Sequence, residues 1–216
     1  IMLLNIKNNL AFRLNQIIKR IFDVVLTLSG GLFLLPLFLG ICVWIKTDSQ
    51  GPAIYKQRRV GKDGKEFDCY KFRSMVVDSK ERLEKLLATD PKAKEEWERD
   101  FKLKNDPRIT KSGAFLRKTS LDELPQLLNV LKGEMSLVGP RPIVQKEVPR
   151  YEQYIKEYYM VLPGITGLWQ VSGRSDTTYP ERVAMDMWYV HNWSVWLDLV
   201  LLWRTVTAVI QSRGAY

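Results

Sequence analysis

Residues 21–45 read IFDVVLTLSGGLFLLPLFLGICVWI, and this one apolar run sets the organisation of the whole chain. As a straight helix it would be roughly 37 Å long, which is enough to cross a bilayer. Pro36 lies in the middle and removes a backbone hydrogen bond, so the run is expected to kink or break there. A cleaved signal peptide is a poor fit, because no small-residue cleavage site follows the run.

The flanks of this run do not decide its orientation, because both are basic. The basic flanking residues are Lys19 and Arg20 before the run, and Lys46, Lys56, Arg58 and Arg59 after it. The positive-inside rule needs an asymmetry between the two sides. Two topologies therefore stay open: a hairpin that enters and leaves the same leaflet, and a single kinked helix that crosses the bilayer.

The chain divides into three parts around the apolar run. Residues 1–19 mix apolar and basic positions and are expected to form an amphipathic lead-in on the membrane surface. Residues 20–46 are the membrane helix, and residues 47–216 are the body outside the membrane. The first residue is Ile1 rather than methionine, so we expect a piece of a longer protein.

The composition indicates a folded domain with an anionic partner. The 216 residues are 46% hydrophobic and 26% charged, and the net charge is +9. Such a balance suits nucleic acid, an anionic membrane surface or a phosphorylated substrate. The single histidine, His191, argues against a Ser-His-Asp triad and excludes a multi-histidine metal site within this chain. Cys42 and Cys69 form no disulfide framework, which fits a reducing compartment.

The body reads as an α+β domain that is mostly helical. Residues 53–56 and 66–72 alternate well enough for a small β-hairpin, with glycines in the turn between them. Residues 77–103 read as charged helices that break at Asp90-Pro91, and this charge is interpreted as a solvated face. Residues 168–171 resemble a short strand between loop signals.

The C-terminal part, residues 179–211, is helical and rich in tryptophan. Tryptophan favours the headgroup zone of a membrane, so interfacial amphipathic helices are expected here. The open alternative is a pair of core-packing helices, since aromatic stripes are common in protein cores.

Residues 119–126 read TSLDELPQ and place two carboxylates, Asp122 and Glu123, near the expected start of a helix. One register makes Ser120 and Glu123 a capping box, and the other makes Asp122 the N-cap. Both put the carboxylates in the positive field of a helix N-terminus, which is expected to lower the aspartate pKa. An ionised aspartate can attack phosphorus, and a neighbouring glutamate can share Mg²⁺ with a diphosphate. The alternative is that the pair only caps a helix.

Residues 136–142 read SLVGPRP and hold Arg141 between two prolines. A rigid turn lowers the entropic cost of placing a guanidinium against a phosphate. The alternative is a purely structural turn. Lys71, Arg73 and Arg117 are further candidate cations, although each taken alone is more often a surface charge.

With these motifs in place, the chain resembles the bacterial sugar transferases, the monotopic polyprenyl-phosphate phosphoglycosyl transferases. The resemblance rests on residues 19–23, 51–55, 70–75, 119–141 and 163–174. It implies a reentrant helix-break-helix over residues 20–46, in the cytoplasmic leaflet of the bacterial inner membrane. One departure is Leu35-Pro36, where the family often has Ser-Pro.

The resemblance implies a two-step reaction at the cytoplasmic membrane surface. Asp122 matches the nucleophile, which attacks the β-phosphorus of a UDP-sugar, releases UMP and forms a phosphosugar-aspartyl intermediate. Undecaprenyl phosphate then takes the sugar phosphate, in the first membrane step of O-antigen, capsule or exopolysaccharide synthesis. Glu123 matches the partner acid, and both acids are candidate Mg²⁺ ligands. The matching candidates for substrate and phosphate binding are Arg141, Lys71, Arg73, Arg117, Gln170 and Arg174.

Within the family, residues 102–110, 167–174 and 214–216 are similar to undecaprenyl-phosphate galactose phosphotransferases. UDP-galactose is therefore the first expected donor, with UDP-glucose as the alternative. The expected partners are the UDP-sugar, undecaprenyl phosphate and membrane lipids, not nucleic acid, and a homodimer stays open. The competing interpretations are a lipid-binding scaffold, a nucleic-acid binder, and a transferase that moves only the sugar and releases UDP.

Overall fold

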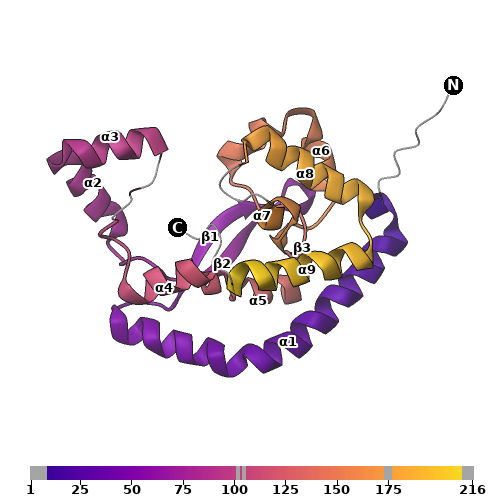
Figure 1. Ribbon diagram of the computed structural model, residues 1–216, viewed down its shortest axis with the longest axis horizontal. Helices are drawn as coiled ribbons and strands as arrows, with labels where there is room; N and C mark the ends of the chain where they lie inside the picture. Colours follow the sequence, from indigo (N-terminus) through magenta and orange to yellow (C-terminus); the bar gives the residue numbers. More distant parts are fainter. Residues whose placement is uncertain (1–8, 101–102, 104–105, 173–176, 211–216) are drawn as a thin grey trace.

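The computed structural model describes residues 9–100, 103, 106–172 and 177–210. Its α-helices are α1 (Arg13–Asp48), α2 (Ser79–Thr89), α3 (Pro91–Asp100), α4 (Lys111–Thr119), α5 (Gln126–Lys132), α6 (Ile155–Tyr159), α7 (Leu168–Ser172), α8 (Tyr179–Asn192) and α9 (Val195–Ile210). Its strands are β1 (Ile54–Val60), β2 (Glu66–Phe72), β3 (Ser136–Val138) and β4 (Gly164–Thr166). Short 3₁₀ segments are η1 (Asn9–Ala11), η2 (Lys62–Gly64), η3 (Leu121–Glu123) and η4 (Gln145–Tyr154). The body lies on one side of α1, and α2 and α3 project from it (Figure 1). The prediction of a mostly helical α+β fold is confirmed.

The apolar run forms one helix, α1, of 36 residues. Its axis bends, and Figure 1 shows the two halves of α1 running in different directions. A proline inside a helix removes one hydrogen bond and kinks the axis, while its fixed φ angle still suits the helix. The sequence predicted a kink or a break at Pro36, and the structure has a continuous bent helix without a break. Because α1 begins at Arg13, the end of the expected lead-in belongs to the same helix, while residues 1–8 lie outside the described residues.

One stripe of α1 rests on the body at both ends of the helix. The buried residues of this stripe are Lys19, Asp23, Thr27, Ile41 and Ile45. Near the start of α1, Nζ of Lys19 lies 2.7 Å from Oδ2 of Asp198 in α9. At its end, a carboxylate oxygen of Asp48 accepts the backbone N–H of Ser112 in α4 at 2.9 Å. The two ends of α1 are thus fixed to the same body.

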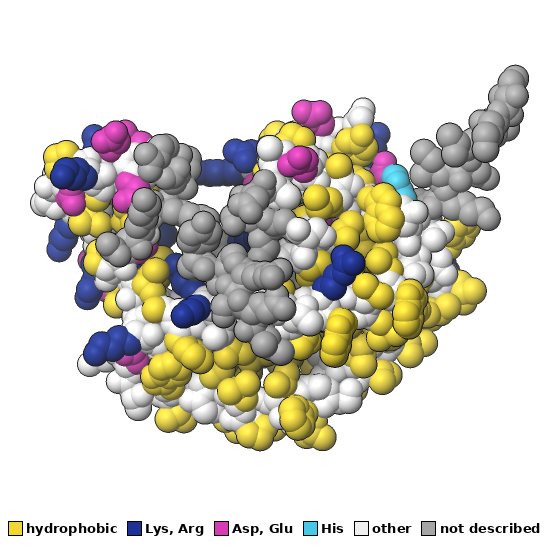
Figure 2. Space-filling view, viewed as in Figure 1, with side chains coloured by type: hydrophobic (Ala, Val, Ile, Leu, Met, Phe, Trp, Pro, Cys, Tyr) yellow, Lys and Arg dark blue, Asp and Glu magenta, His cyan; other side chains and the backbone are white. Residues whose placement is uncertain are grey.

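The remaining surface of α1 is apolar and exposed. Its most exposed apolar side chains include Leu14, Ile21, Leu28, Leu32, Phe33 and Val43. Within the described residues, α1 is the one helix that is long and apolar enough to cross a membrane. Figure 2 shows apolar side chains gathered along the edge of the molecule that α1 and α9 form. This apolar edge indicates association with a membrane.

The predicted hairpin is confirmed by an antiparallel pairing of β1 with β2. The pairing runs from Ile54 opposite Phe72 to Val60 opposite Glu66. β1 therefore continues past the expected end at residue 56. The turn contains Asp63 and a glycine, both in the left-handed region of backbone space, which suits the short connection.

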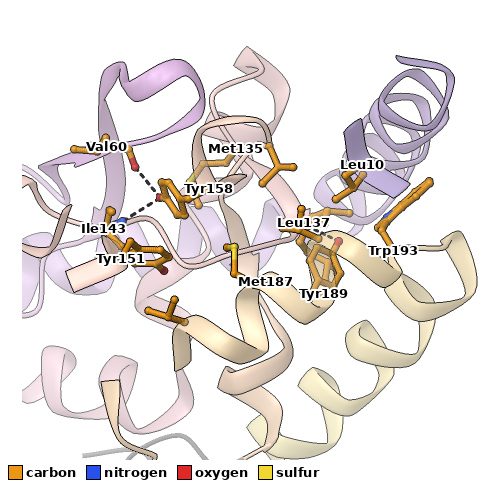
Figure 3. Close-up of a cluster of buried hydrophobic side chains, with 14 of the residues drawn as sticks. Leu10, Val60, Met135, Leu137, Ile143, Tyr151, Tyr158, Met187, Tyr189 and Trp193 are labelled. Carbon is orange, nitrogen blue, oxygen red and sulfur yellow. Dashed lines mark hydrogen bonds between the residues drawn. The ribbon is translucent and has the colours of Figure 1, made fainter. Parts of the chain in front are cut away.

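The main core lies between the hairpin, the β3–β4 pair and α8 (Figure 3). Val60 ends β1 in this core, and its carbonyl accepts the hydroxyl of Tyr158 at 2.9 Å. Met187 and Tyr189 of α8 pack into the same cluster. β3 and β4 are a short parallel pair, so this core joins residues that lie far apart in the sequence.

The two C-terminal helices pack into the core on one face and expose tryptophan side chains on the other. Trp193 is buried in the core, whereas Trp188, Trp196 and Trp203 are 49%, 74% and 70% exposed. Residues 168–171, expected as a strand, instead form most of the helix α7. A short apolar run has no periodicity that separates a strand from a helical turn, which explains that wrong prediction.

Candidate active site

The predicted site residues of the described chain line one cleft of about 1120 Å³. Its walls come from β1, β2, α2, α4, η3, α5, β4, α7, α8 and α9. Candidates from the sequence that line it are Lys71, Arg73, Arg117, Asp122, Glu123, Arg141 and Gln170. Arg174 lies outside the described residues. Segments far apart in the sequence thus place these acids and cations around one space.

The two carboxylates lie on η3, a single 3₁₀ turn between α4 and α5. Ser120 enters this turn with a φ of 57°, and its side chain makes no cap hydrogen bond. α5 begins only at Gln126, with Pro125 at the cap position. Both expected registers, the capping box and the Asp122 N-cap, are therefore wrong. A tight corner aims the two acids into the cleft in place of a helix start.

Lys71 of β2 lies against both carboxylates. Its Nζ is 2.7 Å from Oε1 of Glu123 and 3.8 Å from Oδ2 of Asp122. Glu123 thus forms a close ion pair with Lys71, while Asp122 interacts with the same cation over a greater distance. Asp122 keeps its carboxylate available in the cleft, which a nucleophile requires.

The two acids have opposite pKa shifts. Burial raises the pKa of Asp122 to about 6, and Lys71 and Arg117 only partly offset this. Burial also acts on Glu123, but the charge and hydrogen bond of Lys71, with help from Arg141, hold its pKa below the ordinary value. The expected lowering of the Asp122 pKa is therefore wrong, because desolvation outweighs the local field. A raised pKa near 6 still leaves Asp122 largely ionised at neutral pH.

Two of the predicted cations make structural bonds at the edge of the cleft. The guanidinium of Arg73 donates to the backbone carbonyls of Ser49 and Gln50, directly after α1. Nε of Arg117 donates to Oγ of Ser74 at 2.9 Å. Arg73 therefore fixes the end of the membrane helix to the site, and Arg117 adds positive charge near Asp122.

The turn that carries Arg141 is held by close packing against β4. The N–H of Gly139 donates to the carbonyl of Thr166 at 2.9 Å, and the N–H of Gly164 donates to that of Pro140 at 2.8 Å. A Cβ at Gly164 would overlap the backbone nitrogen of Gly139, so this approach requires glycine. The turn is thus a rigid support for its arginine.

Buried polar groups hold the same turn from the other side. The hydroxyl of Tyr158 contacts the carbonyl of Arg141 at 3.2 Å, and Arg59 donates to the next carbonyl at 3.1 Å. The buried carboxylate of Asp186 accepts the backbone N–H of Arg141 and, at 2.8 Å, the hydroxyl of Tyr151. These groups fix the backbone of Arg141, which leaves its side chain to face the cleft.

The side chain of Arg141 lies over the ring of Trp169, with its Cζ 5.6 Å from the ring centre. Arg182 of α8 lies over the same ring at 4.7 Å. Sequence reasoning did not find Trp169, Arg182 or Asp186. The sequence contains only a weak indication of this role. Arg182 and Asp186 are four residues apart and so share one face of α8, but the tryptophans of this segment dominated its interpretation.

A divalent cation fits the chemistry of the carboxylate pair. Mg²⁺ prefers oxygen ligands and is commonly held by one or two carboxylates together with substrate phosphates and water. Asp122 and Glu123 supply two adjacent carboxylates in an open cleft. Among the described residues no group of three or more acidic, cysteine or histidine side chains could hold a metal ion. The donor set therefore suits Mg²⁺ bound jointly with a diphosphate.

The buried carboxyl of Asp186 predicts a pH-dependent stability. Burial raises its pKa to about 7, so between about pH 4 and pH 7 the folded state holds a proton that the unfolded state releases. This contribution to the free energy of unfolding falls as pH rises through that window. Asp186→Asn removes this titrating group. As the pH rises from about 4.5 to about 7.5, the free energy of unfolding of the variant should therefore increase by on the order of 2–4 kcal/mol relative to that of wild type. Denaturant unfolding in detergent measures this difference. Asp68→Asn, at a surface ion pair, is the control and should follow the wild-type curve.

Comparison with known proteins places this site in a family. The profile of the family described as "Bacterial sugar transferase" matches residues 14–212. The "Undecaprenyl-phosphate galactose phosphotransferase" of Salmonella typhimurium is 57% identical over 217 residues, covering all of this chain and 45% of that protein. The "UDP-galactose-lipid carrier transferase" of Erwinia amylovora is 54% identical over 216 residues, covering all of this chain and 45% of that protein. The "Exopolysaccharide production protein ExoY" of Rhizobium meliloti is 50% identical over 198 residues, which are 92% of this chain and 88% of that protein.

The chain spans about half the length of the first two of these relatives. The family match covers the apolar helix, the hairpin, the carboxylate pair and the Arg141 turn together. The chain belongs to the bacterial sugar transferase family.

Proposed function

We propose that this chain transfers a hexose 1-phosphate from a UDP-sugar to undecaprenyl phosphate, with galactose 1-phosphate as the first candidate and UMP as the product. The observation that carries the proposal is Asp122, ionisable and accessible in a cleft that several cations line. The names of the Salmonella and Erwinia relatives, which specify galactose, support the choice of sugar.

In the first step, a carboxylate oxygen of Asp122 attacks the β-phosphorus of the UDP-sugar. The bond between that phosphorus and the bridging oxygen breaks, and UMP leaves with the electron pair. An acyl-phosphate then joins the sugar phosphate to Asp122. In the second step, an oxygen of undecaprenyl phosphate attacks the same phosphorus. The aspartyl carboxylate leaves, and the lipid carries a diphosphate linked to the sugar.

The cations of the cleft stabilise the charge that moves in these steps. Arg141 is held by its rigid turn and presents a fixed guanidinium to phosphate oxygens, which lowers the cost of reorganisation. Lys71 lies within reach of both acids, so it can balance the phosphate charge beside Asp122. Arg182 adds a second cation over the ring of Trp169.

Asp122 and Glu123 would hold Mg²⁺ together with the diphosphate of the substrate. The ion would neutralise the charge that builds up on the leaving UMP. The ion pair of Glu123 with Lys71 keeps this acid ionised and therefore ready to bind a cation.

The placement of α1 supports a reentrant topology. Both of its ends contact the same body, through the Lys19–Asp198 pair and through Asp48 with Ser112. A helix that crosses the bilayer would separate its ends by the roughly 30 Å hydrocarbon core, and a body on one side could hold only one of them. We therefore place the bent helix in one leaflet of the inner membrane, with the cleft on the cytoplasmic face and the tryptophan side of α9 in the interface.

The product nucleotide tests this function directly. Purified protein is incubated with Mg²⁺, undecaprenyl phosphate and, in turn, UDP-galactose, UDP-glucose and their N-acetyl forms, and the released nucleotide is identified. We expect UMP, with UDP-galactose as the best donor. Release of UDP would show transfer of the sugar alone and contradict the phosphosugar mechanism. A folded protein that releases no nucleotide from any donor would favour the scaffold interpretation.

A further inference from the structure

The cleft is lined by several apolar residues that the proposed chemistry does not use. Leu124 and Leu127 line it from the side of η3 and α5, Ile165 lines it from β4, and Thr205 and Val209 line it from α9. The four apolar members are only partly buried, so they present hydrocarbon to the cleft. We name this set the apolar slot. It begins directly beside the carboxylate pair, because Leu124 follows Glu123 in the chain.

The apolar slot as defined contains one side-chain polar group, the hydroxyl of Thr205, and this group already has hydrogen-bond partners. The hydroxyls of Thr166 and Thr205 lie 2.8 Å apart and bond to each other. The hydroxyl of Thr205 is also 2.7 Å from the carbonyl of Leu201, within its own helix. A nucleobase or a sugar placed here would leave its own donors and acceptors without partners, which is costly. The apolar slot therefore fits a hydrocarbon occupant.

The helix α9 contributes both to the apolar slot and to the exposed apolar surface of the molecule. Val206 is 52% exposed on that face, close to Trp203. Val209 lies three residues after Val206, so the two side chains are neighbours on the helix surface. One faces outward and the other lines the cleft. The two valines thus bring apolar surface of α9 both to the cleft and to the outside of the molecule.

Both walls of the apolar slot are tied to the membrane helix. The guanidinium of Arg20 in α1 donates to the carbonyls of Val130 and Leu131 at the end of α5. Lys19 forms its ion pair with Asp198 of α9. Figure 1 shows α5 and α9 lying beside α1, so a position of α1 in a leaflet would bring both walls close to that leaflet.

We propose that the apolar slot binds the first isoprene units of the acceptor lipid. This proposal rests on the proposed function, because it assigns a place to the tail of its second substrate. The occupant must combine an anionic head with a hydrocarbon chain, since both cations and apolar side chains line the cleft. A polyprenyl phosphate has this form, and its phosphate would reach Asp122 while its first units fill the apolar slot.

The two half-reactions separate this proposal from a general loss of activity. The first is followed without lipid, as exchange of labelled UMP into the UDP-sugar, and the second as transfer to geranyl phosphate in detergent. Val209→Trp fills the apolar slot, whereas Val206→Trp places the same ring on the outer face of α9. We expect Val209→Trp to lower kcat/KM for geranyl phosphate by about tenfold or more, because a buried isoprene unit loses its contacts. Exchange should stay within about twofold of wild type, and Val206→Trp should change neither rate beyond that.

Several results would overturn the proposal. Equal losses in both half-reactions would mean that Val209 contributes to the donor site or to the stability of the fold. A loss with Val206→Trp as large as that with Val209→Trp would show a membrane effect. Unchanged transfer with Val209→Trp would leave the apolar slot without a role. If Val209→Trp does not fold, wild-type protein is crosslinked with a diazirine-bearing geranyl phosphate, and the label must map to the apolar slot. Absence of UMP exchange in folded wild-type protein would instead contradict the proposed function.

Discussion

Asp122→Asn should lower sugar phosphate transfer by at least about 10³-fold, the scale on which loss of a covalent nucleophile acts. An amide is nearly the same size as a carboxylate, but it does not form the acyl-phosphate. UMP release and UMP exchange should fall together, because both pass through the same attack on the β-phosphorus. The measurement is the rate of each half-reaction under saturating donor and Mg²⁺.

The same variant should fold at least as well as wild type. Burial raises the pKa of Asp122, so its charge destabilises the folded state at neutral pH, and Asn removes that charge. A thermal midpoint equal to or above that of wild type would therefore accompany the loss of activity. Asp68→Asn in the hairpin, outside the cleft lining, is the control and should keep full activity. Transfer by Asp122→Asn within about tenfold of wild type would exclude Asp122 as the nucleophile.

The sequence predicted well those features that depend on neighbouring residues. The hairpin follows from alternation on both sides of a glycine turn, and Pro91 separates α2 from α3 as expected. The acids Asp122 and Glu123 were found because the motif places them side by side. Lys71 and Arg141 were named as site residues from their charge and from the family resemblance, and in the structure they line the same cleft as the two acids.

Features that depend on distant contacts were missed. Leu116, Leu121 and Leu124, on both sides of the corner at Ser120, pack into one cluster with Ile41 of α1 and its neighbours. Local capping rules contain no information about that cluster, so they predicted a helix start.

The support of Arg141 was hidden for a similar reason. Asp186 reaches the Arg141 backbone across a sequence separation of 45 residues, and it lies in a helix whose tryptophans dominate the pattern. The pKa shift of Asp122 could not be predicted from neighbouring residues either, because the burial of a side chain depends on the tertiary fold. Only the assembled cleft shows that desolvation outweighs the favourable charges of Lys71 and Arg117.

The second large effect concerns the attachment of α1 to the body. Lys19 is 6% exposed, and the acids near it, Asp23 and Asp198, are 1% and 0% exposed. Asp198 also accepts the hydroxyl of Tyr189 at 2.6 Å and the indole N–H of Trp193 at 3.0 Å. One ammonium therefore balances two buried carboxylates at the joint between α1 and α9.

Lys19→Met should lower the free energy of unfolding by about 3–5 kcal/mol, the usual cost of breaking a buried ion pair by removing one partner. Methionine keeps the apolar stem of the lysine, so the loss comes from the unpaired carboxylates rather than from a cavity. Denaturant unfolding in detergent micelles measures this change. Lys46→Met removes an exposed lysine from the end of the same helix and should cost no more than about 0.5 kcal/mol.

A second variant separates charge from packing at this joint. Adding Asp198→Asn to Lys19→Met removes the unpaired charge, while the amide oxygen can still accept the N–H of Trp193 or the hydroxyl of Tyr189. The double variant should therefore be more stable than Lys19→Met alone, since burying a neutral amide costs less than burying an uncompensated carboxylate. A double variant that is equally or less stable would show that shape, not charge balance, holds α1 on the body. A cost for Lys19→Met no larger than that of Lys46→Met would mean that the ion pair adds nothing to the attachment of the membrane helix.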